Sequence, residues 1–525
     1  MSIKLDQFDY DLIEQYYIKN ILENDFWLFC SHGSNQEKPT SQNTNFETTS
    51  VLEKTVFGIK YENQDVTFML QLIKWEQNNV YVQYDDRAVL KDSPFFVVVE
   101  PEIESGNYHI FKCLSNNNGA PSTEKPEFNP SIQDGLYFLS DGYLWKYMSS
   151  TPFTLFRKFA ARGLIPVIRN QQVEAIANKG IYNVVVENAN ENSGYEKITG
   201  LVRSVGIENG ITRIFLRSLF SETSRTNPIF EVPNTYSNRS IYIENANVST
   251  GIAAIELQIR DSGVINGTPF VTVSTPIDFT IAENDDVQIL PRLEIIGDGT
   301  GSTAIPIFDE EGIRISGIKM VSFGDGYSSA IARVLDPVSF DPNNVNRQDI
   351  RCLVRPILSP RNGHGSNVLQ ELRSKHLGLS KIITSVGGNN VPNEGTYSKF
   401  AIVKEPEFSG NFDDSTFDNR IRIELQNLPN NIQVGDSVSQ GFVSGIVHEI
   451  DQETNSIFIV DYEGPYNQQF VSNEPLRFQN SNFVINSIEY SLYKQKTGTV
   501  LTITDVTPIE RDEDRSEQIR LILDF

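Results

Sequence analysis

Cys30 and His32 stand two positions apart in NDFWLFCSHG and are the first pair in the chain that could carry out nucleophilic chemistry. On a strand they share one face about 6–7 Å apart, whereas a thiolate activated by an imidazole needs a hydrogen bond of about 3 Å and a third orienting group. A zinc site would need a second Cys or His pair at ligand spacing, and the sequence offers none. The pair therefore indicates a buried thiol beside a loop histidine.

Two Gly-Asp-Gly turns occur in IIGDGTGSTA and VSFGDGYSSA. The first is superficially like a glycine-rich phosphate loop, but such a loop opens a helix, and here the chain continues as the strand-like STAIPIFDEEG. Asp298 and Asp325 could supply oxygen ligands to Ca²⁺, although two isolated turns fall far short of a ligand set. We interpret both turns as tight reversals between strands.

His364 lies between two glycines in NGHGS, the most unusual polar loop of the chain. A histidine in such a loop can be catalytic, but no Ser/Asp pattern accompanies it, so a structural role is favoured. Carboxylates are abundant and no spacing singles out a glycosidase pair, which leaves a hydrolase as an open alternative. We expect no catalytic residue, no metal ligand and no cofactor-binding residue, and hence no enzyme.

Tyr143, Trp145 and Tyr147 in DGYLWKYMSSTP fall at i, i+2 and i+4, so on a strand the three rings share one face. A row of large rings is more often buried packing or an interface than a sugar-stacking platform. The three residues are therefore candidates for a core or interface, with a carbohydrate platform as the alternative.

The composition limits the class of partner. With 525 residues, the chain is long enough for roughly two to four domains. Its 44 Lys and Arg against 68 Asp and Glu give a net charge of −24, which argues against nucleic acid and anionic membrane and favours partners with basic patches. Three cysteines without a C-x-x-C pair fit a reducing compartment. No signal peptide and no apolar run of membrane-spanning length is visible.

The elements that position these residues are predicted to be mainly strands. Residues 5–23 are predicted to form a helix, Phe26–Cys30 a strand, and Thr48–Ser50 the start of a helix that includes Val51, Leu52 and Val56, while 66–75 could be either. Strand-length runs dominate from about residue 78, a short helix is expected within 364–376 with Ser366 or Asn367 as its cap, and SGIVHEID with NSIFIVDYEG predicts a hairpin.

The chain ends in QIRLILDF, where Ile519, Leu521, Leu523 and Phe525 form one apolar face of a strand. Loose termini are usually polar, so we expect this strand to pair into a sheet, either its own or a neighbour's. Leu521, Leu523 and Phe525 are therefore further core or interface candidates.

Several segments together resemble a known family. DGYLWKYM, preceded by YHIFKCLSNNNGAPS, is similar to the dimeric baseplate wedge subunit, gene product eight, of T-even-type contractile-tailed phages. NDFWLFCSHG, TTSVLEKTVFGIK and the closing TPIERDEDRSEQIRLILDF match the same family in the same order. The resemblance covers about residues 20–160 and 500–525, and residues 170–490 look like a large β-rich insertion.

The resemblance implies a structural protein of the virion tail. It would assemble in the host cytoplasm and act through a homodimer and contacts to other wedge subunits, with neither nucleic acid nor membrane as a partner. The expected fold is α+β and mainly β, with an N-terminal body at 1–165, inserted antiparallel β domains at 166–350, a further β region with a short helix at 351–490, and strands at 491–525 that return to the N-terminal body. A carbohydrate- or receptor-binding tail module is the alternative function.

Overall fold

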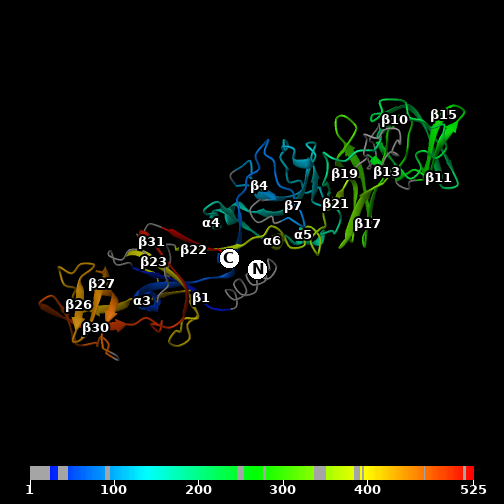
Figure 1. Cartoon of the computed structure of the whole chain (residues 1–525). Helices are drawn as coiled ribbons and strands as arrows, with labels where there is room; N and C mark the ends of the chain where they lie inside the picture. Colours follow the sequence, from blue (N-terminus) through cyan, green and yellow to red (C-terminus); the bar gives the residue numbers. More distant parts are fainter. Residues whose placement is uncertain are drawn as a thin grey trace. The chain divides into compact units, whose positions relative to one another are not determined.

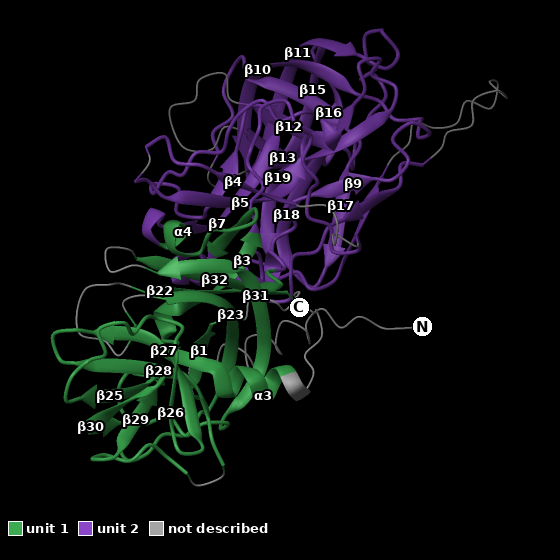
Figure 2. Cartoon of the chain, turned by 90° about the vertical axis from the view of Figure 1, so that its left-hand side faces the viewer, with its two compact units in different colours: residues 1–70, 155–166, 374–525 green, residues 71–154, 167–373 purple. Residues whose placement is uncertain are grey.

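The computed structural model of the chain describes residues 24–32, 45–88, 95–103, 105–244, 254–275, 279–335, 351–383, 391–392, 395–465, 468–511 and 516–524. Most of the regular structure is antiparallel β, so the prediction of a mainly β, α+β fold is confirmed (Figure 1). The helix expected at 5–23 lies outside the described residues. The chain divides into two compact units, which consist of residues 1–70, 155–166 and 374–525 (unit 1) and residues 71–154 and 167–373 (unit 2; Figure 2).

Unit 1 contains a five-stranded antiparallel sheet with the order β24-β2-β1-β23-β31. Its strands are β1 (Phe26–Ser31), β2 (Thr55–Lys60), β23 (Gly395–Lys404), β24 (Thr416–Asp418) and β31 (Thr499–Arg511). β1 is buried along its whole length, as expected for a central strand that is covered on both faces and therefore shows no polar alternation. The predicted strand at Phe26–Cys30 is confirmed.

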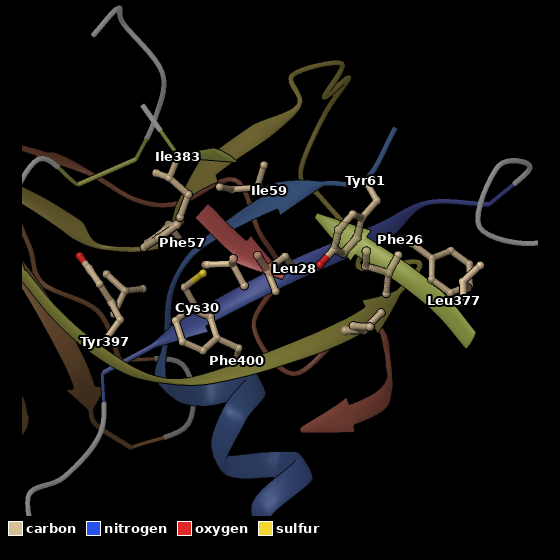
Figure 3. Packing of buried hydrophobic residues seen from close by; sticks show 14 residues of the cluster. Phe26, Leu28, Cys30, Phe57, Ile59, Tyr61, Leu377, Ile383, Tyr397 and Phe400 are labelled. Carbon is tan, nitrogen blue, oxygen red and sulfur yellow. The ribbon is translucent and has the colours of Figure 1, made fainter. Parts of the chain in front are cut away.

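A second sheet of unit 1 has the order β32-β22-β3-β8. Its strands are β3 (Val66–Gln71), β8 (Leu164–Val167), β22 (His376–Ile383) and β32 (Glu517–Asp524). The segment 66–75, which periodicity left undecided, is thus a strand as far as Gln71. One apolar cluster includes Leu28 and Phe57 from the five-stranded sheet and Leu377 from this one, so the two sheets share a core (Figure 3).

The third part of unit 1 is a closed six-stranded barrel with the order β25-β28-β27-β26-β29-β30. Its strands are β25 (Ile421–Leu425), β26 (Ser437–Gln440), β27 (Val443–Asp451), β28 (Ser456–Glu463), β29 (Pro475–Phe478) and β30 (Ser481–Glu489). Closure leaves no unpaired sheet edge, and alternate residues such as Ile423, Val447 and Ile457 fill the interior. The predicted hairpin of SGIVHEID and NSIFIVDYEG is confirmed as β27 paired with β28.

Unit 2 contains a four-stranded sheet with the order β4-β5-β7-β6 and a seven-stranded sheet with the order β13-β12-β16-β10-β11-β15-β14. The first has strands β4 (Phe96–Val99), β5 (Tyr108–Asn116), β6 (Leu136–Phe138) and β7 (Tyr143–Thr151). The second has strands β10 (Ile198–Glu208), β11 (Ile211–Ser221), β12 (Ser240–Glu244), β13 (Ala254–Gln258), β14 (Asp261–Ile265), β15 (Thr268–Ser274) and β16 (Asp286–Leu290). Antiparallel β structure was expected at 166–350, and all strands of the seven-stranded sheet lie within that range.

Three two-stranded sheets complete unit 2. They pair β17 (Leu293–Gly297) with β20 (Ala330–Val334), β18 (Thr300–Phe308) with β19 (Ile315–Asp325), and β9 (Val184–Val186) with β21 (Val354–Pro356). The two Gly-Asp-Gly segments connect β17 to β18 and β19 to β20, so each joins strands of two different small sheets instead of closing a hairpin. Positive φ angles occur at Gly324 and Gly326, where glycine is needed.

The described helices are short. They are α3 (Asn45–Lys54), α4 (Phe153–Phe159), α5 (Gln171–Ala175) and α6 (Val368–Glu371), with 3-10 turns η2 (Asn63–Asp65) and η3 (Asn117–Gly119). α3 begins before the predicted start at Thr48–Ser50, and Val56 lies in β2 instead of the helix, because Phe57 and its neighbours pair with β1. The short helix within 364–376 is confirmed as α6, and Asn367 caps it by accepting a hydrogen bond from the amide of Gln370 at 3.2 Å.

The two units correct the expected domain boundaries. Residues 1–165 do not form one body, because 71–154 group with 167–373, and the expected division at 350 falls at 373. The local pattern could not show this, since it does not encode which distant strands pair. Within 491–525, β31 and β32 join the sheets that contain β1 and β3.

Candidate functional site

The three rings of β7 lie in the core of unit 2. Tyr143 and Trp145 have no exposed surface and stack on each other with centroids 5.5 Å apart, while Tyr81 meets Trp145 edge-on at 5.6 Å. Tyr147 is also buried and packs on Phe111, its direct partner in β5. None of the three presents a ring face to a ligand, so they offer no platform for stacking a sugar.

The opposite face of the same strands carries two buried lysines. Lys112 of β5 and Lys146 of β7 are direct partners in the antiparallel register, and both are almost fully buried. Lys146 donates to the carbonyl of Asp134 at 2.6 Å. Lys112 lies 2.8 Å from Oε2 of Glu371 and 2.9 Å from Nδ1 of His364. We call Lys112, Lys146, His364 and Glu371 the buried charge cluster.

The loop before α6 brings His364 and Glu371 to this cluster. Glu371 Oε1 accepts hydrogen bonds from the amides of Gly365 at 2.8 Å and Asn367 at 3.3 Å, so its carboxylate closes the loop upon itself. Gly363 has a φ of +92°, and a Cβ there would lie 2.7 Å from the backbone of Asn178. The glycines that flank His364 therefore serve close backbone packing.

Burial and neighbouring charges decide the protonation of the cluster. Burial, then Lys112, lower the pKa of His364 to about 3. Burial alone would raise the pKa of Glu371, but the charge of Lys112, the largest opposing influence, lowers that pKa to about 2. Because an ammonium group can only donate, Nδ1 of His364 accepts from Lys112 and the imidazole is neutral at pH 7. Glu371 and Lys112 then form a compensated buried pair beside a neutral histidine.

Lys146 completes the electrostatics of the cluster. Burial lowers the pKa of Lys146 to about 8, against the opposing effect of Asp134 and Glu371. The pKa of Lys112 is lowered by burial as well, although Glu371 counteracts this. The Lys112 ammonium also lies 4.1 Å from the centroid of the Tyr84 ring, which compensates part of its lost hydration.

The buried charge cluster has the residue types of an acid–base catalytic site, but its side chains are not accessible to a substrate. The side chains of Lys112, His364 and Glu371 are 0%, 2% and 4% exposed, so a substrate cannot reach them in this conformation. Each charge is instead used within the fold, where the cluster fastens the 362–371 loop and α6 to β5. Its arrangement suits a structural role. Truncating either Lys112 or Glu371 would leave the charge of the other buried and uncompensated.

The other predicted polar positions are engaged within the fold. Cys30 is fully buried among Leu28, Phe57 and Phe400, and burial raises the pKa of its thiol (Figure 3). His32 does not contribute to a Cys–His pair, because its Nε2 lies 3.0 Å from Oδ1 of Asp461. The interpretation as a buried thiol beside a loop histidine agrees with this geometry.

The acidic turns hold backbone amides. Asp298 accepts hydrogen bonds from the Ser328 hydroxyl and from the amides of Ser328 and Ser329, the amides each at 2.9 Å. The hydroxyl first, and then the two amides, lower the pKa of Asp298. Asp325 accepts from the amide of Lys179 at 3.2 Å. Among the residues that the structure describes, no three His, Cys, Asp or Glu side chains are grouped as a metal site would require.

The C-terminal candidates belong to β32. Leu521 pairs with Leu379 and Leu523 with Leu377, and both leucines are half-buried against the core shared by the two sheets of unit 1. Phe525 lies outside the described residues. The terminal strand therefore pairs into a sheet of its own chain, which is one of the two arrangements expected; the other was pairing with a neighbouring subunit.

Sequence reasoning found His364 but missed Lys112, Lys146 and Glu371. The available signal was a lysine in the middle of an apolar strand, which occurs twice, in YHIFKCL and GYLWKYM. A charge at such a position predicts a buried partner. The partner lies 259 residues further along the chain, a separation that no local pattern reveals.

No protein-family model matches the chain, and no curated protein is significantly similar to it. In the part of the chain that the structure describes, the helices are too short or too polar to cross a bilayer.

Proposed function

We propose that the chain is a structural subunit of a phage tail baseplate wedge. It acts through a homodimer and through interfaces with other wedge subunits, and it carries out no catalysis. The observation that carries the proposal is the ordered set of segments that resemble the wedge family, from NDFWLFCSHG near the start to the closing QIRLILDF.

The placement of these segments supports the proposal. NDFWLFCSHG contains β1, TTSVLEKTVFGIK covers most of α3 and all of β2, and DGYLWKYM contains most of β7. The final segment supplies the end of β31 and all of β32, which join the sheets that contain β1 and β3. The resembling segments are therefore core elements of the sheets, which is where a shared fold would retain sequence.

The polar chemistry of the chain also fits a building block. The buried charge cluster, the Cys30 thiol and the Asp298 carboxylate are each engaged by the chain itself. Large apolar side chains lie exposed on both units, among them Phe442 at 81% and Ile207 at 67%. Exposed apolar groups of this size are candidate contacts with other subunits, since permanent interfaces bury about 2,000 Å² or more and are rich in apolar side chains.

Light scattering on the purified chain tests the proposal first. The expected mass is twice the 59.2 kDa of one chain. Mixing the chain with purified wedge subunits of a T-even-type phage and sedimenting the mixture tests the second part, and co-sedimentation is expected. A monomer that also fails to join any wedge subunit would overturn the proposal.

A further inference from the structure

The seven-stranded sheet of unit 2 has one face in the core and one exposed. Along β11, Thr212, Ile214 and Leu216 point into the core, and Arg213 and Arg217 point outward. β10, β11 and β15 lie side by side (Figure 1), and Phe215 pairs with Phe270 on the outward side. We call the outward residues Arg203, Arg213, Phe215, Arg217, Arg260 and Phe270 the arginine face.

The four guanidinium groups are held in place by neutral partners. Arg203 donates to the hydroxyl of Thr268 at 2.9 Å, and Arg260 donates to the hydroxyl of Ser274 at 2.7 Å. Arg217 donates to the side-chain oxygen of Asn284. Arg213 lies over the ring of Phe270, 5.4 Å from its centroid. Each guanidinium is thereby oriented and keeps most of its donors for a partner.

No carboxylate of the described residues pairs with these four arginines, although the chain has 68 acidic and 44 basic side chains. Other arginines of unit 2 do pair, such as Arg239 with Glu196 and Arg355 with Asp85. Acidic residues do occur near the face: Glu208 ends β10, and Asp261 accepts the hydroxyl of Thr272. The chain has a net charge of −24, so carboxylates are plentiful. Pairing within the chain therefore does not account for these four arginines, and we look for a partner outside it.

The face combines this charge with exposed rings. Phe215 and Phe270 have ring centroids 6.3 Å apart and are only half-buried, and Ile211, four residues before Phe215 on β11, is 38% exposed. Arginine and aromatic side chains are enriched among the residues that dominate protein–protein binding energy. An oriented guanidinium binds a carboxylate through two parallel hydrogen bonds, which adds specificity to the attraction.

We propose that the arginine face binds an acidic surface of another protein chain. Charge complementarity selects an acidic partner, and the rings and Ile211 select one that also offers apolar contact. A protein is favoured over nucleic acid because Glu208 and Asp261 would repel a continuous phosphate backbone, while discrete carboxylates can be placed between them. The inference depends on this face alone and stands whether or not the chain belongs to a baseplate.

A peptide-binding assay on the full chain tests the inference. The probe is a short fluorescein-labelled poly-glutamate peptide, with a poly-glutamine peptide of equal length as the neutral control, followed by fluorescence anisotropy at low and physiological salt. The test variant is R213Q/R217Q. The matched control is R361Q/R477Q, which removes the same charge from two exposed arginines outside the face.

Poly-glutamate is expected to bind the wild type, more weakly as salt rises, and R213Q/R217Q is expected to bind about tenfold more weakly. R361Q/R477Q should bind like the wild type. R203Q/R260Q removes the arginines on the two sides of β11 and should also weaken binding. Absence of binding to the wild type, or equal losses in R213Q/R217Q and the control variant, would overturn the inference. Tighter binding of an oligothymidylate on the same face would assign it to nucleic acid instead and would equally overturn it.

Discussion

Replacing Lys112 with methionine keeps most of the unbranched stem of the side chain and removes its charge. The change leaves Glu371 buried without the ammonium group that lies 2.8 Å from its carboxylate. His364 also loses the hydrogen bond that its Nδ1 accepts at 2.9 Å. Methionine can follow the path of the lysine stem, so no large cavity forms and the electrostatic loss decides the outcome.

The magnitude follows from the burial of both partners. Because the Lys112 and Glu371 side chains are 0% and 4% exposed, solvent cannot screen the isolated carboxylate, and the expected loss in unfolding free energy is about 3–5 kcal/mol. Glu371→Gln alone should cost a similar amount, since Lys112 is then uncompensated. The double variant K112M/E371Q removes both charges and keeps an acceptor for the amide of Gly365, so it should lose about 2 kcal/mol less than the sum of the single variants.

Urea unfolding at pH 7 measures the total loss, and hydrogen exchange read by mass spectrometry assigns it to peptides from β5 and β7. Lys494→Met is the matched control, because Lys494 pairs with Glu407 at 3.2 Å on the surface, where both side chains are more than half exposed. The control should change stability by less than about 0.5 kcal/mol. The buried Lys112–Glu371 pair does not stabilise the fold as we describe if K112M loses no more unfolding free energy than K494M. The same follows if the losses of K112M and E371Q simply add.

Three further predictions follow from the same structure. Burial lowers the pKa of His364 from 6.5 to about 3, so the stability that its neutral form contributes is fully present above pH 6.5. As the pH falls from 6.5 towards 3, the free energy of unfolding should fall by up to about 1.4 kcal/mol per pH unit. H364N should flatten this slope when the free energy of unfolding is measured by denaturant titration at each pH. The pKa of Glu371 is lowered from 4.5 to about 2, so protonation of Glu371 adds to the loss of unfolding free energy between pH 4.5 and pH 2. Trp145→Ala removes a fully buried ring and should cost about 3–5 kcal/mol in urea unfolding. Deletion of 521–525 removes the half-buried Leu521 and Leu523 and should cost about 2–3 kcal/mol, seen as a lower melting temperature.

Each of these predictions can fail separately. An unchanged acid slope in H364N would show that His364 is not the titrating group. An unaltered stability in W145A would contradict the packing of β7, and glycan binding that disappears in this variant would favour the carbohydrate-binding alternative. A truncated chain with the melting temperature of the wild type would show that β32 is not docked.

Local patterns in the sequence predicted local structure. The apolar run at Phe26–Cys30 is β1, the polar stretch before Val368 caps α6, and the alternation after Gln518 is β32. In each case the physical signal, side-chain periodicity or a capping side chain, lies within the element itself. Val56, which was expected in the helix, lies in β2, where pairing with β1 ends the helix.

Long-range pairing could not be predicted in the same way. β1 is hydrogen-bonded to β23, whose partner residues lie more than 350 positions away, and nothing within either strand specifies the other. The same limit hid the division into two units and the pairing of Lys112 with Glu371. The rings of β7 showed that a face would be buried, but only the register of β5 shows that the opposite face carries a charged cluster.

The central claim is that the chain works by shape as a wedge subunit of a tail baseplate. An electron cryomicroscopy reconstruction of phage tails purified from cells that produce the chain tests it most directly. The account predicts density for the chain in the baseplate, as a dimer in contact with other wedge subunits. Purified tails that lack the chain, or a map in which it stands alone with a ligand in an open cleft, would contradict the claim.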